Sequence, residues 1–349
     1  MLKNSNGSAL ISVLLMAIIL NLVFMAVYMA VSRTQKMTGK NRVTTSALTI
    51  AEAGKERLYG EIAHKIFTPT PGAKVTAYTN TPLGNGFFSV SVQSNMAIDR
   101  IWVESIGKVN SLQSKIECIA SIQPEINFNF PVGIGAAIVA NGDVDLLGNI
   151  IIDGRDHDTN GVVIGPGGFG VSTCDQLSTG GSSSVGGKGI APGKKGAEPG
   201  TYEENLPEDT RFDSPEAFLG LPPGALDKYK TNNPQIPING IVYVTASDYD
   251  LKHLGNSYGI LIVHNVFGNA NLKLNTGEFK GLIIVDQMNK INGNATIKGA
   301  VVTLRKASST FGNGNAEILY SSMILNNLGK YCPNVNRIVR EESWKEVPN

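Results

Sequence analysis

The chain has 349 residues, which is enough for two or three structural units, and its 30 basic and 29 acidic residues leave a formal net charge of +1. This balance argues against a general electrostatic affinity for nucleic acid, which requires clustered positive charge. The 39 glycines, set among only 17% charged residues, indicate many turns and therefore a β-rich protein.

The first predicted element is a membrane-spanning helix over residues 9–31. This run carries no charge, and as a helix it is long enough to cross the apolar core of a bilayer. It is too long for a cleavable secretory signal, and the sequence "VSRTQKMTGKNR" that follows it contains no small-residue cleavage site. The alternative, a buried core helix, is disfavoured because the run is apolar on every side.

The same helix is predicted to continue as an amphipathic segment, so that one long helix covers residues 8–68. Pro69 and Pro71 end it, because proline cannot continue a helix. Apolar residues recur every three or four positions and form one face, made of Val43, Ala47, Ile50, Ala51, Gly54, Leu58, Ile62 and Ile66.

A short polar leader that ends in Gly7, the small residue Ser8, and an apolar helix that becomes amphipathic together resemble a type IV pilin-like precursor. The segments "GSALISVLL" and "ALTIAEAGKERL" are similar to the N-terminal segment of PilX-type pilus assembly proteins. The resemblance covers roughly residues 5–66. It implies a leader over residues 1–7, cleavage by a prepilin peptidase between Gly7 and Ser8, and a retained helix that contacts other pilin subunits and the membrane.

Two features depart from the pattern of major pilins. Ser12 stands where those proteins carry a glutamate, which points to a minor pilin or assembly protein. Lys3 alone precedes the span, whereas Arg33, Lys36, Lys40 and Arg42 follow it, and the positive-inside rule would place the bulk of the chain in the cytoplasm. The resemblance implies the opposite orientation. We expect an inner-membrane protein of a bacterium whose C-terminal domains are extracytoplasmic and reach the pilus or cell surface after assembly.

Residues 71–128 are predicted to form a small antiparallel sheet. Alternating apolar and polar residues between 84 and 123 are typical of half-buried strands, and Gly107 and Asn110 mark turns. Packed on the amphipathic helix, such a sheet makes a small α+β, pilin-like domain. Cys118 is expected in its core.

Residues 131–330 are predicted to form a β-solenoid-like head, that is, an irregular β-helix, so that the whole chain is α+β and mostly β. Gly259, Gly281 and Gly299 begin similar short apolar strands at spacings of about 20 residues, the length of one coil. A β-sandwich is the alternative. The glycine-rich residues 165–201 are predicted to be a surface loop, two short helices are predicted after Ser214, and residues 331–349 are assigned to a C-terminal tail.

The stretch "DGRDHDTNG" is a candidate Ca²⁺ site, because Asp156, Asp158, Asn160 and Gly161 match the first half of a calcium-binding loop and Asp153 adds a carboxylate. Gly167 stands where such a loop needs its glutamate. The alternative is a solvated turn whose aspartate and asparagine bond their own backbone, with His157 exposed. Cys118, Cys174 and Cys332 form no CxxC pair, which argues against a cysteine metal site and leaves one disulfide and one spare thiol open.

The function expected from these features is that of a non-enzymatic pilin-like subunit, a minor pilin or tip protein, whose head is adhesive toward a surface or glycan. One alternative is a membrane-anchored β-helix enzyme that cleaves carbohydrates, for which Asp248, Asp250 and Asp286 are single acidic candidates. The other is a type II secretion pseudopilin. No cofactor other than Ca²⁺ is expected.

Overall fold

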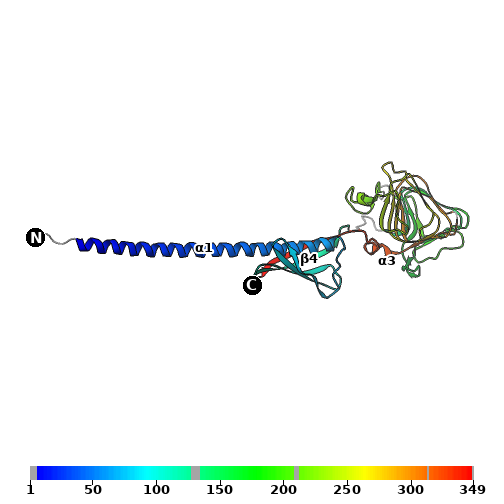
Figure 1. Ribbon diagram of the computed structural model, residues 1–349. Coiled ribbons are helices and arrows are strands. Elements are labelled where there is room, and N and C mark those ends of the chain that lie inside the picture. Colours follow the sequence, from blue (N-terminus) through cyan, green and yellow to red (C-terminus); the bar gives the residue numbers. More distant parts are fainter. Residues whose placement is uncertain (1–5, 127–133, 208–211, 313, 348–349) are drawn as a thin grey trace. The chain divides into compact units, whose positions relative to one another are not determined.

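The computed structural model describes residues 6–126, 134–207, 212–312 and 314–347. The chain divides into two compact units (Figure 1). The first combines Met1–Gln123 with Arg337–Asn349, and the second is Pro124–Asn336. The second unit is therefore inserted between two segments of the first.

The N-terminal helix α1 runs from Asn6 to Ala63, which confirms the predicted long helix (Figure 1, blue). The helix ends several residues before Pro69, where the sequence predicted its end. Lys65 adopts a left-handed φ of 58°, the Lys65 N–H donates to Ile62 O, and the Ile66 N–H donates to Glu61 O. These two bonds satisfy the last carbonyls of the helix in a Schellman-type cap, so the chain turns away before Pro69.

The sheet of the first unit contains five strands in the order β1-β2-β3-β4-β24, and the pairs β1–β2, β2–β3 and β3–β4 are antiparallel. The bounds are β1 Lys74–Leu83, β2 Gly86–Ser94, β3 Arg100–Val109, β4 Leu112–Pro124 and β24 Arg337–Val347. The predicted antiparallel sheet is thus confirmed. The assignment of residues 331–349 to a tail is wrong, because residues 337–347 complete this sheet.

The amphipathic half of α1 packs on one face of this sheet. The predicted apolar stripe is buried at Ala47, Ala51, Leu58 and Ile62, and Cys118 lies in the same core, as expected. Helix and sheet approach closely at Gly107, where a side chain would overlap backbone atoms of Ala47 and Ala51. The apolar stripe therefore determines which face of α1 packs on the sheet, and Gly107 in β3 allows the helix to approach the sheet closely.

We expect Gly107→Ala to destabilise the first unit by roughly 2–3 kcal/mol, because its new methyl group overlaps backbone that cannot rotate away. Gly60→Ala is the matched control: Gly60 lies in α1 with open space around it, so alanine should stabilise the helix by about 1 kcal/mol. Thermal unfolding followed by tryptophan fluorescence measures both. Equal melting temperatures for the two variants would contradict the close approach at Gly107.

The second unit is built mostly from parallel strands. Its largest sheet contains eleven strands. Their bounds are β5 Ala136–Ala140, β7 Ile151–Asp153, β10 Phe169–Thr173, β12 Ser184–Gly186, β13 Gly196–Ala197, β14 Tyr202–Glu203, β15 Asn239–Val244, β17 Asn256–Val263, β19 Gly277–Val285, β21 Ala295–Thr303 and β23 Glu317–Tyr320.

Two three-stranded parallel sheets accompany it. One has the order β16-β18-β20 and the other β11-β6-β22. The bounds are β16 Asp248–Leu251, β18 Asn271–Leu274, β20 Gln287–Ile291, β11 Leu177–Thr179, β6 Val144–Leu146 and β22 Ser309–Phe311. A small antiparallel pair, β8 Asp156–His157 and β9 Val163–Gly165, completes the strands. The short helices are α2 Pro215–Phe218, the 3₁₀ helix η2 Asp227–Tyr229, α3 Ser322–Leu325 and α4 Leu328–Tyr331.

Glycines that recur in the sequence occupy one column of the large sheet. Gly240, Gly259, Gly281 and Gly299 pair in register through β15, β17, β19 and β21. All four have positive φ angles, and a side chain at Gly281 would overlap the carbonyl oxygen of Gly259. The predicted repeat is therefore present as strand register. The sheets are mostly parallel and remain separate, so the structure supports stacked repeats but does not show a closed solenoid.

The first repeat of this unit pairs with the last one. β5, β6 and β7 pair with β21, β22 and β23, respectively, all in parallel. Tyr320 Oη also donates a hydrogen bond to Ile134 O at 2.8 Å. The two ends of the unit meet elsewhere, where the Glu125 N–H donates to Asn336 O at 2.8 Å, and this contact allows the unit to be inserted between β4 and β24.

The glycine-rich segment 165–201 is not a surface loop, which corrects the prediction. It contributes β10, β11, β12 and β13, and Ser184 and Val185 are buried. These strands are two to five residues long, so they show no alternation of their own and depend on pairing with β5, β6 and β7. The predicted helix start is confirmed: the Ser214 side chain accepts from Ala217 N and caps α2.

Candidate functional site

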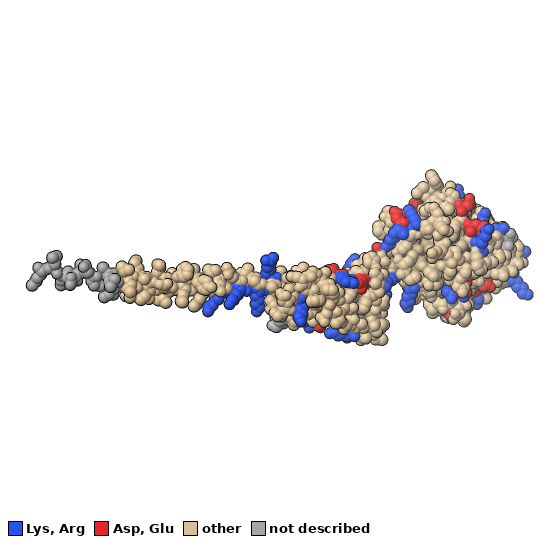
Figure 2. Space-filling view, in the orientation of Figure 1, with Lys and Arg blue, Asp and Glu red and all other residues tan. Residues whose placement is uncertain are grey.

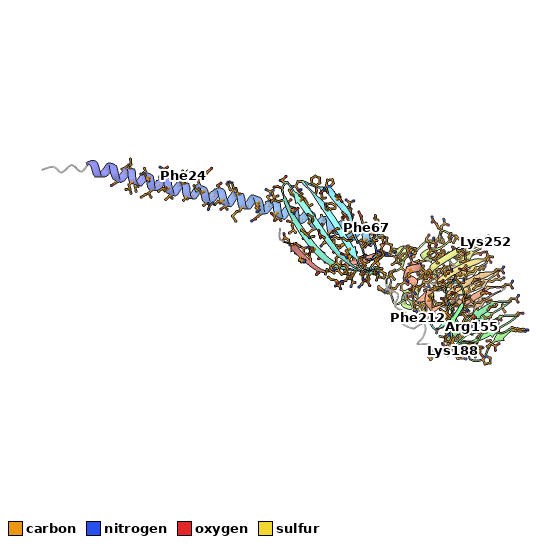
Figure 3. The ribbon with its side chains drawn as sticks, turned by 90° about the horizontal axis from the view of Figure 1, so that it is seen from below. Phe24, Phe67, Arg155, Lys188, Phe212 and Lys252 are labelled. Atoms are coloured by element: carbon orange, nitrogen blue, oxygen red, sulfur yellow. The ribbon has the colours of Figure 1, made fainter. Side chains whose placement is uncertain are left out.

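The first candidate site is the N-terminal half of α1, which is apolar and uncovered. Its large side chains between residues 13 and 31 are 50–74% exposed. They radiate from the helix on all sides, as the view around Phe24 shows (Figure 3). Burying one such side chain is worth roughly 1.5–3 kcal/mol, so together they provide a strong driving force toward lipid or other apolar helices. By length and composition, α1 is able to cross a membrane.

Polar groups within the apolar half of α1 are accommodated by the helix itself. Asn21 Nδ2 donates to Ala17 O at 2.9 Å, one turn earlier. This bond lowers the cost of placing the amide in an apolar medium, because one donor is already satisfied. Arg33 is the first basic residue after the apolar run, and basic side chains appear along the following part of α1 (Figure 2).

The predicted processing residues lie at the start of this helix. Gly7 and Ser8 belong to the first turn of α1, whereas residues 1–5, most of the predicted leader, lie outside the described residues. The first turn of any helix lacks intrahelical acceptors for its N–H groups and opens readily. Its position is therefore compatible with a peptidase reaching the Gly7–Ser8 bond, and cleavage itself stays a prediction.

The second candidate site was the acidic stretch 153–160, and the structure gives its carboxylates separate protein partners. Asp153, 4% exposed, accepts from Arg155 Nη2 at 2.6 Å and lies 3.4 Å from His157 Nε2. Burial acts to raise the pKa of Asp153, but the bonds from His157 and Arg155 outweigh it and lower that pKa to about 2. This carboxylate therefore belongs to an internal ion-pair cluster.

The other members of the stretch are also engaged. Asp156 accepts from the backbone N and the Oγ of Ser322, at 2.8 and 2.6 Å, and so holds the first turn of α3. Asp158 Oδ1 accepts from Asn160 N and Val162 N, each at 2.8 Å. Bonds from the backbone N–H groups of Val162 and Asn160 lower the pKa of Asp158. This is the geometry of the alternative interpretation, a turn that bonds its own backbone.

Within the described residues, no three His, Cys, Asp or Glu side chains are grouped so that they could hold a metal ion. The predicted set Asp153, Asp156, Asp158 and Asn160 is therefore not brought together as a Ca²⁺ site. The expected exposure of His157 is also wrong: it is 2% exposed, and its Nδ1 lies 3.0 Å from Tyr320 O. Together these contacts join the segment after β7 to the end of β23 and the start of α3.

The Asp153–His157 pair predicts a pH dependence. Burial lowers the pKa of His157, but its bond to Asp153 outweighs burial and raises that pKa above its ordinary value. Its stabilising contribution is thus complete below about pH 6.5 and is lost as the pH rises through the raised pKa. The contribution of Asp153 is present above about pH 4 and is lost as the pH falls toward 2.

We expect Asp153→Asn to cost the second unit roughly 3 kcal/mol near pH 6 and to flatten its stability profile between pH 6 and 8. Scanning calorimetry across that pH range measures both effects. Asp158→Asn, in the exposed turn, is the matched control and should leave both the melting temperature and the pH profile close to those of the wild type. An unaltered pH profile in Asp153→Asn would refute the assigned ion pair.

Single carboxylates considered for carbohydrate cleavage are separately partnered as well. Asp286 is 1% exposed and accepts from Ala270 N and Asn265 N, and its Oδ1 lies 2.6 Å from His264 Nδ1. Asp248 and Asp250 accept from the side chains of Asn271 and Asn275. Each of these three carboxylates is thus bonded to neighbouring protein groups.

The chain matches no protein-family model and none of the curated proteins. Among solved structures, it is similar to the crystal structure of the competence-associated pilin ComZ from Thermus thermophilus. The two are 13% identical, the match covers 87% of this chain and 97% of that chain, and the TM-score is 0.28. A TM-score this low leaves the fold and function of this chain to be argued from its own elements.

Proposed function

We propose that this protein is a non-enzymatic pilin-like subunit, a minor pilin or pilus assembly protein. The observation that carries the proposal is α1: one continuous helix whose first half is apolar and exposed on all sides and whose second half packs on an antiparallel sheet. A helix of this kind can lie in a bilayer before assembly and among the helices of other subunits afterwards. Cleavage between Gly7 and Ser8 by a prepilin peptidase would free it for that transfer.

The second unit is proposed to be an irregular β-solenoid head on the extracytoplasmic side. Successive strands alternate between the large sheet and the smaller ones, in the order β15 to β22. The strands β15, β17, β19 and β21 pair in parallel one after another, and so do β16, β18 and β20. Each such pair of strands would be one coil. Adhesion to a surface or glycan is the role that such a head supports.

The proposal is tested by shearing filaments from cells that express the chain with a type IV pilus system. We expect the chain in the sheared fraction and expect Gly7→Val to keep it in the membrane, because the precursor is not cleaved. Gly39→Ala changes a glycine elsewhere in α1 that has open space around it, and should leave the distribution unchanged. Equal amounts of wild type and Gly7→Val in the sheared fraction would refute the processing route.

A further inference from the structure

The face of the first unit's sheet that points away from α1 carries a groove of about 540 Å³. Side chains alternate along β3 and β4, so Val103 and Cys118 point into the core while Trp102, Glu104 and Glu117 point to the other face. The groove also needs β24, which supplies one wall (Figure 1, red, beside β4). Neither of the sites described above includes it.

Both tryptophans of the chain line this groove. Trp102 lies on β3 and Trp344 on β24, and they are 41% and 42% exposed. β4 runs between these strands, so Ile119 and Glu117 form the floor between the two indoles. Two half-exposed indoles on opposite walls offer flat apolar surfaces to anything that enters.

The polar groups of the groove are held in place by ion pairs. Glu104 Oε2 lies 3.3 Å from both Lys74 Nζ and Lys115 Nζ. Glu117 lies 3.1 Å from Lys115 and 2.8 Å from Lys345, and these bonds, led by the one from Lys345, lower its pKa. Lys115 thus pairs with both carboxylates, while Lys74 and Lys345 each pair with one of them, so positive and negative groups are interleaved along the groove. Such a groove favours a neutral ligand with many hydroxyl groups over a charged one.

We propose that this groove binds an oligosaccharide. A pyranose ring has a face of C–H groups that can stack on an indole and a rim of hydroxyls that can donate to Glu104 and Glu117 and accept from Lys345 and Gln93. The site goes beyond the proposed function, because it lies in the first unit rather than the head and requires neither cleavage nor filament assembly. An apolar peptide would instead cover these carboxylate and ammonium groups without replacing their water.

The binding test uses the full chain purified in a detergent whose headgroup is not a sugar. Intrinsic tryptophan fluorescence is specific here, because Trp102 and Trp344 are the only tryptophans. Titration with chitotriose, maltotriose and galactotriose is expected to give a saturable change with at least one of them. Trp102→Ala and Trp344→Ala, measured by isothermal calorimetry, are each expected to weaken that binding about tenfold or more.

Two further variants separate binding from folding. Glu117→Gln keeps the shape of the floor but removes an ionised acceptor, and is expected to weaken binding about tenfold while its melting temperature stays near that of the wild type. Phe267→Ala removes an 82%-exposed aromatic side chain of the second unit and should bind as the wild type does. No saturable change with any of the three trisaccharides would overturn the proposal. So would a response only to a proline-rich peptide, or one that follows protein concentration without sugar.

Discussion

Gly281→Ala should unfold much of the second unit at temperatures where the wild type is stable. Gly281 has a φ of 149°, a conformation that only glycine adopts readily, and its new methyl group would overlap the carbonyl oxygen of Gly259 in the next strand. Because both obstacles are backbone, side-chain repacking cannot relieve them. We expect a loss of roughly 4 kcal/mol or more, measured by scanning calorimetry.

The matched control for this variant is Gly268→Ala. Gly268 also has a positive φ, 58°, but nothing lies within 4 Å of where its methyl group would be. Its cost is expected to be about 1 kcal/mol, the strain of a left-handed alanine alone. Equal melting temperatures for Gly281→Ala and Gly268→Ala would contradict the close backbone contact in the column formed by Gly240, Gly259, Gly281 and Gly299.

Deleting residues 337–349 should destabilise the first unit, although these residues are far in sequence from the rest of that unit. β24 pairs with β4, and its Val339 packs against the core shared with α1. Glu341 Oε2 lies 2.6 Å from Lys55 Nζ, whose side chain is 8% exposed, so the deletion leaves this ammonium in the interior without its strongest partner. We expect the free energy of unfolding to fall by roughly 3–5 kcal/mol, so that the unfolding transition reported by Trp102 fluorescence occurs at a lower temperature.

A shorter truncation that removes only residues 348–349 serves as the control and should melt as the full chain does. The calorimetric transition of the second unit should persist in both truncated forms, because that unit has its own core. Unchanged fluorescence melting after deletion of 337–349 would mean that the four strands β1–β4 and α1 are stable alone, contrary to the account of an interrupted unit.

Features with a strong local period were predictable. The apolar run over residues 9–31 and the apolar stripe that follows it predicted α1. The alternation between residues 84 and 123 predicted the antiparallel strands. The spacing of Gly259, Gly281 and Gly299 indicated the register of the parallel strands, because a backbone column without room for side chains demands glycine in every repeat.

Features that depend on distant partners were not predictable. β24 reads "RIVREESWKEV", and most of its residues are exposed, so only pairing with β4 makes it a strand. The short strands of the glycine-rich segment 165–201 likewise form only because they pair with distant strands. The pairing of the first repeat with the last one also leaves no pattern in the sequence. The backbone N–H and C=O groups at a strand edge can bond to any parallel neighbour, whichever repeat it belongs to.

The candidate sites illustrate the same limit. The spacing of Asp153, Asp156 and Asp158 suggested shared cation binding, but Arg155, Ser322 and the backbone of the turn each take one carboxylate. The tryptophan groove has no signal in the sequence, because its two walls come from the two separate segments that make up the first unit. A count of aromatic residues could not reveal that Trp102 and Trp344 meet on one face.

The most direct test of the pilin-like proposal is N-terminal mass analysis of the membrane-extracted chain, expressed with and without a prepilin peptidase. We expect a mature chain that begins at Ser8 and keeps the rest of α1 when the peptidase is present, and an intact leader when it is absent. A chain that retains Met1 under both conditions would contradict the pilin-like proposal, and a plain membrane-anchored protein would then be the better description.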